Sequence, residues 1–566
     1  MPVARKTIGA DAVNMSIIVV IGALVCLPTF VYGAPNGHSI VYNLVWLREF
    51  SAQLAAGELY PRWLLDVNEG AGSPAFFFYA PVPFYIVSFG AAFCASCTIT
   101  IKLAVGEWLL FIFSGVAFYV FAREVARPWP SLFGALLYML LPYHFEIDLW
   151  HRQAIGEFSA YIWMPLILLF VRRISRGENA VAGLAITYGL LIASHLPAAL
   201  LFSVCLVIYA ATLPRGEDPG TAARRFAIGV LLGILLAGVY LVPALFMQQH
   251  ISTEYWRLPH LAFHQWFFLD GRDEPDPAFG GRLFWVVSLA TLMFGVLWTI
   301  ALGRERRNRL REMLPWLLFI VFAWFLMSPL SRPLWDFVPI LQKVQFPYRV
   351  AIIIDLAVAA TAVYALQRIF TAPRLTTVLG IGLCVVLFGY SAYTGSKDAR
   401  QLLTPHHNRQ RLTIIDAQVR SGAGPKEYVP PWVNIPPAEI RRQLARIPQL
   451  SFAASTGSAT ITGWEPRRIV IEVDLHQQTD LIVRQFYFPG WQARQLSAKS
   501  IDLQTGPAEA TGLVRIIAPP GQYKIELRLL PRWQETAGQW STGIAILLLL
   551  VMQAWSRWSR PHQAAP

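Results

Sequence analysis

The sequence predicts an α-helical polytopic membrane protein of about twelve spans, with interfacial helices in its first outer loop and a C-terminal extracytoplasmic β-sandwich. Three observations predict this fold. Of the 566 residues, 55% are hydrophobic and 14% are charged, which leaves more apolar surface than a soluble core could hide. Apolar runs of about 17 to 25 residues recur along the chain, separated by short basic clusters. Near the C-terminus, hydrophobic and polar residues alternate as they do in short strands.

The predicted spans fall near 13–33, 100–121, 131–144, 154–171, 180–196, 198–213, 226–247, 283–302, 314–330, 350–367, 375–395 and 538–556. With this assignment every basic cluster, from Arg5 and Lys6 to Arg557 and Arg560, lies on one side, as cytoplasmic loops require. Both termini are therefore predicted to be cytoplasmic. Membrane orientation also accounts for much of the net charge of +13, so nucleic acid is not an expected partner.

The apolar segment 76–95 is a thirteenth candidate span, but charge placement argues against it. If it crossed, every basic cluster after the first would move outside. We therefore predict a helix that lies on, or dips into, the outer face as part of a long outer loop over 34–99. Three further polar segments are expected on the same side: 144–154, 248–282 and 331–349.

The composition changes to that of a soluble domain after Lys397. Residues 1–396 are predicted to form the transmembrane domain, 397–535 the β-sandwich, and 536–566 the last anchor with a cytoplasmic tail. Alternating residues between Pro and Gly turns predict strands at Ile469–Val473, Leu481–Phe486, Leu513–Ile517 and Tyr523–Leu529.

The five cysteines do not predict a disulfide framework. Their number is odd, and most lie inside apolar runs, where cysteine packs as a small hydrophobe. Cys94 and Cys97 form a C-x-x-C pair, without a second pair for zinc or a thioredoxin-like context. We expect these two residues only to pack.

The outer loop 34–99 holds ionisable residues among aromatic ones. Leucines at helical spacing predict an interfacial helix that turns Arg48 and Glu49 toward water, although Glu49 is also a candidate for substrate binding. Arg62 lies between aromatic residues, which suits either a lipid-headgroup anchor or a contact to a diphosphate. Both interpretations of Arg62 stay open.

Charged residues also lie near the outer ends of predicted spans. Glu157 stands just inside a span, where an ionisable group is unfavourable unless paired, so it is a functional candidate beside Asp148. Glu157 lies five residues after Arg152, which is not the spacing of an i,i+4 pair. The alternative to a functional role for Glu157 is a structural ion pair with another helix. His195 precedes a proline and could bind phosphate or cap a helix. Arg349 is well placed to meet an anionic headgroup or pyrophosphate.

The loop 248–282 carries possible ligands for a divalent cation: Glu254, His260, His264, Asp270, Asp273 and Glu274. The loop has no H-x-x-x-H on a convincing helix with a nearby Glu. A solvated turn accounts for Asp273 and Glu274 as well as a metal site does. No Walker loop, dinucleotide fingerprint or G-x-S-x-G motif is present. We therefore expect no nucleotide cofactor, and an activated substrate would be carried by lipid.

Several motifs together resemble one family. The outer loop reads W-L-R-E-F-S-x-Q-L-x-x-G-E-L-Y-P-R-W and then N-x-G-x-G-S-P-x-F-F-F-Y-x-P-x-P-F-Y, and Arg152 to Glu157 reads R-x-A-x-x-E. The C-terminal region contains Q-F-Y-F-P-G-W-Q-A and A-P-P-G-Q-Y. Over nearly its whole length the chain resembles bacterial polytopic membrane proteins described as 6-pyruvoyl-tetrahydropterin-synthase-related. These look like members of the GT-C superfamily of membrane glycosyltransferases, which implies a location in the bacterial inner membrane.

The resemblance also implies a donor and a catalytic group. GT-C enzymes use a polyprenyl-phosphate sugar, and an acidic residue near the start of the first outer loop serves as base or metal ligand. The family pattern has Asp directly after Gly-His, where this chain has Ser39. If the activity is kept, the groups that could replace that carboxylate are His38, Glu49, Glu146, Asp148 and Glu157.

The leading hypothesis is transfer of a sugar from a polyprenyl-phosphate donor to a cell-envelope glycan or lipid acceptor outside the cytoplasm. His38, Asp148 or Glu157 would be the base, and the loop arginines would bind the phosphate. The alternative, which Ser39 favours, is a non-catalytic membrane protein that binds or moves a lipid-linked glycan. Ion-coupled transport is a third hypothesis, supported only by the two acids inside spans, Glu107 and Asp355.

Overall fold

The computed structural model describes residues 8–214, 216, 218–253, 255, 258, 261–270, 276–303, 306–369, 389, 393, 405–436, 439–496 and 500–558. Within these residues, nine helices are long and apolar enough to cross a membrane. They are α1 (Ile8–Tyr32), α6 (Ile99–Ala122), α7 (Pro128–Leu140) continued by the π-helix η1 (Tyr143–Arg152), α8 (Ile155–Ser175), α11 (Pro219–Leu236), α13 (Pro277–Leu302), α14 (Arg306–Met327), α17 (Ala351–Ile369) preceded by η7 (Pro347–Val350), and α21 (Trp533–Trp558). The protein is therefore a mostly helical, multi-pass membrane protein.

Among the described residues, fewer helices reach spanning length than the twelve expected. The expected spans 180–196 and 198–213 are the shorter helices α9 (Val181–Ile192) and α10 (Leu196–Thr212). The expected span 226–247 is divided into α11 and α12 (Gly238–Phe246). The expected span 375–395 is almost entirely outside the described residues.

Four helices occupy the outer loop: α2 (Ile40–Ala55), α3 (Val67–Gly70), α4 (Ala75–Phe78) and α5 (Val82–Ala92). The 11 residues of α5 extend about 16 Å, whereas a span needs about 20 residues. Segment 76–95 is thus not one continuous spanning helix, because Tyr79 takes an extended conformation after α4. Instead α5 packs on α6, where Gly90 and Gly106 let the two backbones approach.

The expectation that Cys94 and Cys97 only pack was wrong, because the structure joins them in a disulfide. The chain turns after α5, and the turn brings the two Cα atoms to 5.4 Å, within the range that a disulfide bridges. The remaining described cysteines, Cys26 and Cys205, are buried free thiols.

Segment 144–154 was expected to be an outer loop, and this expectation was also wrong. Helix α7 ends where Leu141 adopts a ψ of 135° ahead of Pro142, and η1 then begins. All residues of η1 except His151 are buried. At its end Gln153 takes a left-handed conformation (φ 54°), which turns the chain into α8.

The C-terminal β region consists of two antiparallel sheets, of strand order β1-β4-β8-β7 and β2-β3-β9-β5-β6. The strands are β1 (Leu450–Ser451), β2 (Gly457–Glu465), β3 (Arg468–Leu475), β4 (Thr479–Phe486), β5 (Trp491–Leu496), β6 (Ile501–Leu503), β7 (Thr505–Pro507), β8 (Leu513–Ala518) and β9 (Gly521–Leu529). The four predicted strands coincide with β3, β4, β8 and β9, whose buried residues alternate with exposed or half-buried ones. Helices α19 (Pro405–Arg420) and α20 (Ile440–Leu444) precede the sheets.

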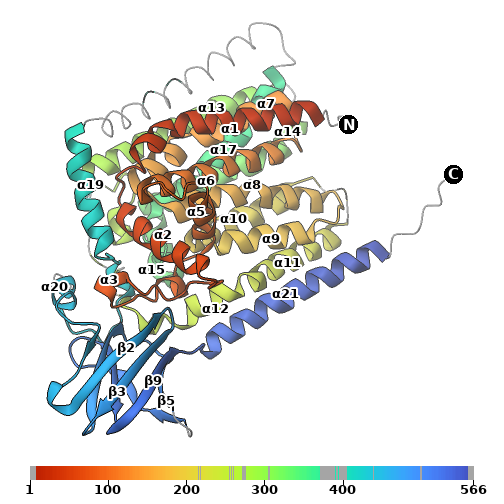
Figure 1. Ribbon diagram of the computed structural model, residues 1–566. Helices are drawn as coiled ribbons and strands as arrows, with labels where there is room; N and C mark the ends of the chain where they lie inside the picture. The colour runs from red at the N-terminus through yellow and green to blue at the C-terminus, as the bar shows by residue number, and fades with distance from the viewer. Residues whose placement is uncertain are drawn as a thin grey trace.

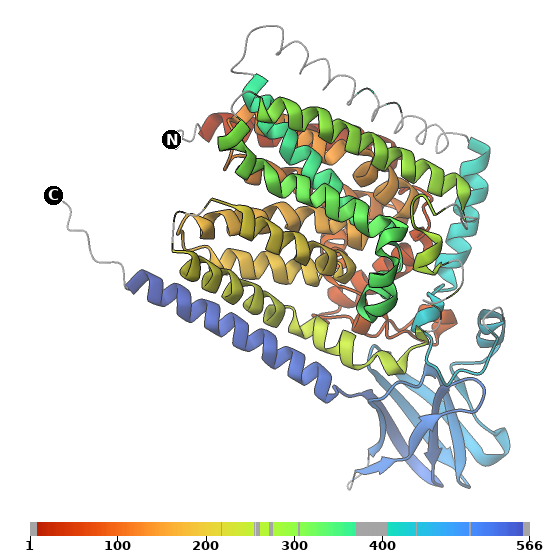
Figure 2. The same ribbon diagram turned by 180° about the vertical axis from the view of Figure 1, so that it is seen from behind.

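The β region lies at one end of the helical bundle, and α21 leads from it along α12 and α11 to the opposite end (Figure 1). The start of α1 and the end of α21 both lie at that opposite end, on different sides of the bundle, as the view from behind also shows (Figure 2). The outer loop lies at the same end as the β region. We call this end the β side of the bundle.

Candidate functional site

Four charged residues meet on the β side, and we call them the arginine cluster: Asp148, Arg152, Glu157 and Arg349. The Glu157 atom Oε2 lies 2.9 Å from Nη1 of Arg152 and 3.4 Å from Nε of Arg349. Arg152 Nη1 also lies 2.5 Å from Oδ1 of Asp148. Two guanidinium groups from different parts of the chain therefore converge on one carboxylate oxygen.

The turn between η1 and α8 creates this arrangement. Because Gln153 is left-handed, the end of η1 folds back toward the start of α8, so Arg152 and Glu157 face one another. Helical spacing had not predicted the pair of Arg152 and Glu157. Residues five positions apart can form such an ion pair when a turn like this one separates them. Arg349 arrives separately in η7, just before α17.

Aromatic residues surround the cluster, and sequence reasoning had missed their part in it. The Tyr143 hydroxyl donates to Oε1 of Glu157 at 2.8 Å. The guanidinium carbon of Arg152 lies 5.3 Å from the centre of the Tyr348 ring, a cation–π distance. Tyr143 and Tyr348 belong to the same short segments as the predicted residues, and that adjacency was the available signal.

Side-chain exposure in the cluster increases toward the arginines. It is 1% for Glu157, 7% for Arg152 and 15% for Arg349. Asp148 is fully buried, and its Oδ2 atom accepts no hydrogen bond from the described residues. An incoming ligand would therefore meet the guanidinium groups before the carboxylates.

His38 lies at the edge of the cluster. Its backbone N–H donates to the His151 carbonyl at 2.9 Å, and its exposed ring packs edge-on against Phe279. Partial desolvation of the ring and then the charge of Arg152 lower the pKa of His38, against the opposing effect of Asp276. A histidine with a lowered pKa is neutral near pH 7 and can accept a proton.

Ser39 follows directly and is fixed by its backbone. Its N–H donates to the Arg152 carbonyl at 3.0 Å, while its side chain makes no capping bond to α2. The residue at the position where the family pattern has Asp therefore lies against the end of η1.

His195 lies beside the cluster but also has a structural role. Its Nδ1 atom accepts from the backbone N–H of Ala198 at 3.3 Å, so the ring caps α10. A Cβ atom at Gly156 would lie 3.4 Å from the His195 ring and 3.1 Å from the Tyr79 hydroxyl, so glycine lets both approach the start of α8. Burial raises the pKa of Tyr79 to about 12, although Arg349 and Arg152 oppose this.

Two other predicted residues lie away from the arginine cluster. Glu49 is 7% exposed and pairs with Arg48 at 3.0 Å, so the expectation that it faces water was wrong. Its Oε2 atom accepts from the backbone N–H of Asp66 because α2 packs against the rest of the loop. Burial and then the charge of Asp66 raise the pKa of Glu49, although Arg48 opposes this.

Arg62 belongs to a second buried group. Its Nε atom lies 3.3 Å from Glu535 in α21, and Glu535 also pairs with Arg467 of the β region at 2.9 Å. Nη2 of Arg62 donates to the Val239 carbonyl at 2.8 Å. That carbonyl lacks its helical partner because the residue four positions later is Pro243.

Gln485 completes this contact between the outer loop and the β region. The Trp63 indole donates to its Oε1 at 2.7 Å, and its Nε2 donates to the carbonyls of Gly70 and Leu65 at 2.8 and 3.2 Å. We call Arg62, Arg467, Gln485 and Glu535 the joint.

Most of the proposed metal ligands lie in a part of the chain that the structure does not describe. Among the described residues there is no group of three or more His, Cys, Asp or Glu side chains that could hold a metal ion. Of the candidates in loop 248–282, Glu254, His260, Asp273 and Glu274 lie outside the described residues. Glu146, the other acid considered, is buried and pairs with Arg282 of α13.

Comparison with known protein families gives one match. A profile described as 6-pyruvoyl-tetrahydropterin synthase related domain, membrane protein, matches residues 76–395, more than half of the chain. The chain belongs to this family. The matched region contains Asp148, Arg152, Glu157 and Arg349, whereas most of the outer loop and the whole β region of this family member lie outside it. A search of curated proteins found no match.

Proposed function

We propose that the protein is a membrane glycosyltransferase of the GT-C type, which moves a sugar from a polyprenyl-phosphate donor to an extracytoplasmic acceptor. The observation that carries the proposal is the convergence of Arg152 and Arg349 on one oxygen of Glu157. Paired guanidinium groups are the protein groups best suited to a phosphate, because each offers five N–H donors in a planar fork.

The position of the cluster suits a lipid-borne phosphate. It lies at the ends of helices of spanning length, where a polyprenyl chain would remain in the membrane and its headgroup would reach the arginines. The start of α8 adds the positive end of a helix dipole. In this pose the phosphate takes the place of Glu157 as the partner of the two arginines.

The reaction requires a base and stabilisation of the leaving group. The base, His38 or Asp148, removes the proton of an acceptor hydroxyl, whose oxygen attacks the anomeric carbon of the sugar. The bond between that carbon and the phosphate oxygen breaks, and its electron pair leaves with the phosphate. Arg152 and Arg349 stabilise the charge that develops there.

A binding measurement tests the phosphate site first. Arg349→Ala is expected to weaken binding of polyprenyl phosphate to the detergent-purified protein by about tenfold or more, the effect of losing a charge-assisted hydrogen bond. Arg332→Ala is the matched control, because Arg332 is an exposed arginine of nearby α15 (Arg332–Phe337) and pairs only loosely with Asp336. Equal binding by wild type and Arg349→Ala would overturn the assignment.

A transfer assay then separates the two functional hypotheses. The wild type is incubated with a panel of radiolabelled polyprenyl-phosphate sugars and cell-envelope extract, and His38→Gln and Asp148→Asn identify the base by loss of transfer. A protein that binds the donors but transfers no sugar would instead be the non-catalytic carrier of a lipid-linked glycan. Ser39, which has no carboxylate, is the observation that favours this second candidate.

A further inference from the structure

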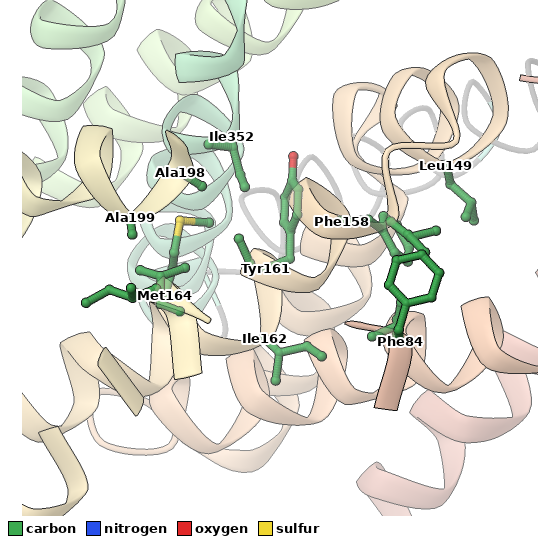
Figure 3. Packing of buried hydrophobic residues seen from close by; sticks show 14 of the residues in the cluster. Phe84, Leu149, Phe158, Tyr161, Ile162, Met164, Ala198, Ala199 and Ile352 are labelled. Atoms are coloured by element: carbon green, nitrogen blue, oxygen red, sulfur yellow. The ribbon is translucent and has the colours of Figure 1, made fainter. Parts of the chain in front are cut away.

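A buried hydrogen-bond centre lies deeper in the bundle than the arginine cluster. The Asp355 atom Oδ2 accepts from the backbone N–H of His144 at 3.0 Å and from the Tyr161 hydroxyl at 3.1 Å. All three residues are buried, with at most 1% exposure. Figure 3 shows Tyr161 among apolar side chains that include Phe158 and Ile352. These polar groups are therefore surrounded by hydrocarbon.

The three partners belong to elements that form the arginine cluster or directly follow it in the chain. His144 lies in η1, which also carries Arg152. Tyr161 lies in α8, one helical turn beyond Glu157. Asp355 lies in α17, which begins just after Arg349. One oxygen atom thus ties together the elements whose charged side chains converge at the site.

The start of η1 requires such an acceptor. The first N–H groups of a helix have no partner within it, and η1 starts afresh after Pro142. A buried N–H group without a partner is strongly unfavourable, and no water is expected in the hydrocarbon region. Asp355 supplies the acceptor from a neighbouring helix, and a carboxylate also suits the positive end of a helix.

Ring contacts fix the same turn. The His144 ring stacks on the Tyr161 ring with centroids 3.6 Å apart and planes 2° from parallel. The Nδ1 atom of His144 lies 2.8 Å from the Tyr138 carbonyl at the end of α7. The first turn of η1 is therefore held by both the backbone N–H group and the side chain of His144.

We propose that Asp355 is a positioning residue that sets the register of η1 and thereby holds Asp148 and Arg152 against Glu157. A shift of η1 by one residue would rotate Arg152 away from Glu157 and break the convergence of the two arginines. The role requires an oxygen acceptor at this position and does not require a proton transfer. Its consequence for ligand binding rests on the proposed function, whereas its consequence for η1 does not.

Two substitutions of Asp355 distinguish a requirement for a hydrogen-bond acceptor from a requirement for a negative charge. Asp355→Asn keeps an oxygen that can accept both hydrogen bonds, whereas Asp355→Leu removes it. Thr361→Val is the matched control, because Thr361 is another fully buried polar residue of α17. All variants are studied as the full chain in detergent, by hydrogen exchange of peptides that cover 143–153 and by polyprenyl phosphate binding.

Asp355→Leu is expected to speed exchange in 143–153 by about tenfold or more, with little change elsewhere, and to weaken polyprenyl phosphate binding to a similar degree. Asp355→Asn and Thr361→Val should stay close to wild type in both measurements. Unchanged exchange in Asp355→Leu, or a loss in Asp355→Asn as large as in Asp355→Leu, would overturn the proposal.

If Asp355→Leu does not fold, Tyr161→Phe provides the test. It removes the hydroxyl that orients the Asp355 carboxylate, so exchange in 143–153 should rise, but by less than in Asp355→Leu, and polyprenyl phosphate binding should weaken in step. Exchange in 143–153 at the wild-type rate in that variant would overturn the proposal. If exchange changes as expected but the wild type binds no polyprenyl phosphate, the positioning role stands and the proposed function fails.

Discussion

The joint and the arginine cluster both bury arginines against carboxylates, but their residues come from different kinds of sequence. The joint uses Gln485 from the motif Q-F-Y-F-P-G-W-Q-A and Arg62 from the motif of the outer loop. The cluster takes Arg152 and Glu157 from the short R-x-A-x-x-E motif, whereas Asp148 and Arg349 lie outside every quoted motif. The two longer motifs therefore meet where parts of the protein are held together, while the candidate chemistry combines one short motif with separate segments.

A glycine of the outer loop also marks the joint. Gly72 has a φ of +78°, and a Cβ atom there would lie 2.5 Å from Oε1 of Gln485 and 2.7 Å from the Trp63 ring. The N-x-G-x-G-S-P motif thus permits the backbone to approach the β region. A motif of this kind indicates close packing, and here the outer loop packs against Gln485 of the joint.

Glu535→Ala should have the largest effect of the variants that test this comparison. Removing the carboxylate leaves Arg62 buried without its partner, which is expected to lower the free energy of unfolding by about 3–5 kcal/mol. Thermal unfolding measures this loss, and the exposed pair of Arg494 and Asp502 provides the control. Asp502→Ala should change stability by less than about 0.5 kcal/mol, and a similar loss in both variants would contradict a structural joint.

Gly72→Ala should cause the next largest loss in the free energy of unfolding. Strain at positive φ and the clash with Gln485 together predict a loss of about 2–3 kcal/mol. Gly57 has a φ of +94° with nothing within 4 Å of its added Cβ, so Gly57→Ala measures the backbone strain alone, about 1 kcal/mol. If the two variants lose equal stability in thermal unfolding, the contact between Gly72 and Gln485 contributes nothing.

Glu157→Gln should distinguish the cluster from the joint by the sign of its effect. Removing the negative charge frees Arg152 and Arg349, so polyprenyl phosphate should bind more tightly, by roughly threefold to tenfold. Gln485→Leu, in the joint, should leave the affinity unchanged when both are measured at the same ionic strength. Weaker binding in Glu157→Gln would show that the carboxylate orients the arginines rather than competing with the ligand.

The smallest expected effect is on the pH dependence of transfer. A histidine can act as the base only in its neutral form, and the pKa of His38 lies below its usual 6.5, so the rate should stay level as the pH falls through 6.5 and decline only at lower pH. Asp276 raises this pKa, so Asp276→Asn should move the decline to still lower pH. A decline in the wild type centred at or above pH 6.5 would exclude His38 as the base.

Local patterns were sufficient for much of the fold. Apolar runs of spanning length predicted the long helices, and alternation predicted β3, β4, β8 and β9, because burial in one layer imposes a period on the sequence itself. The basic clusters also indicated that segment 76–95 does not span. The family was recognisable from its motifs, and the match over 76–395 confirms it.

Turns and long-range contacts were not predictable in the same way. The π-helix η1 was taken for a loop because its charged residues resemble a solvated segment. They are buried because Glu157 and Arg282 pair with them from other helices, while Asp355 accepts from the backbone N–H of His144. The disulfide between Cys94 and Cys97 likewise depends on how the chain turns after α5.

By itself, the sequence determined that the protein spans a membrane, where its long helices and four of its strands lie, and which charged residues lie near the ends of spans. The tertiary structure decided that Arg152 and Arg349 share Glu157, that Glu49 is buried away from them, and that Arg62 pairs with Glu535. The physical reason is that hydrophobic periodicity is a property of neighbouring residues, whereas an ion pair between segments depends on a turn such as the one at Gln153.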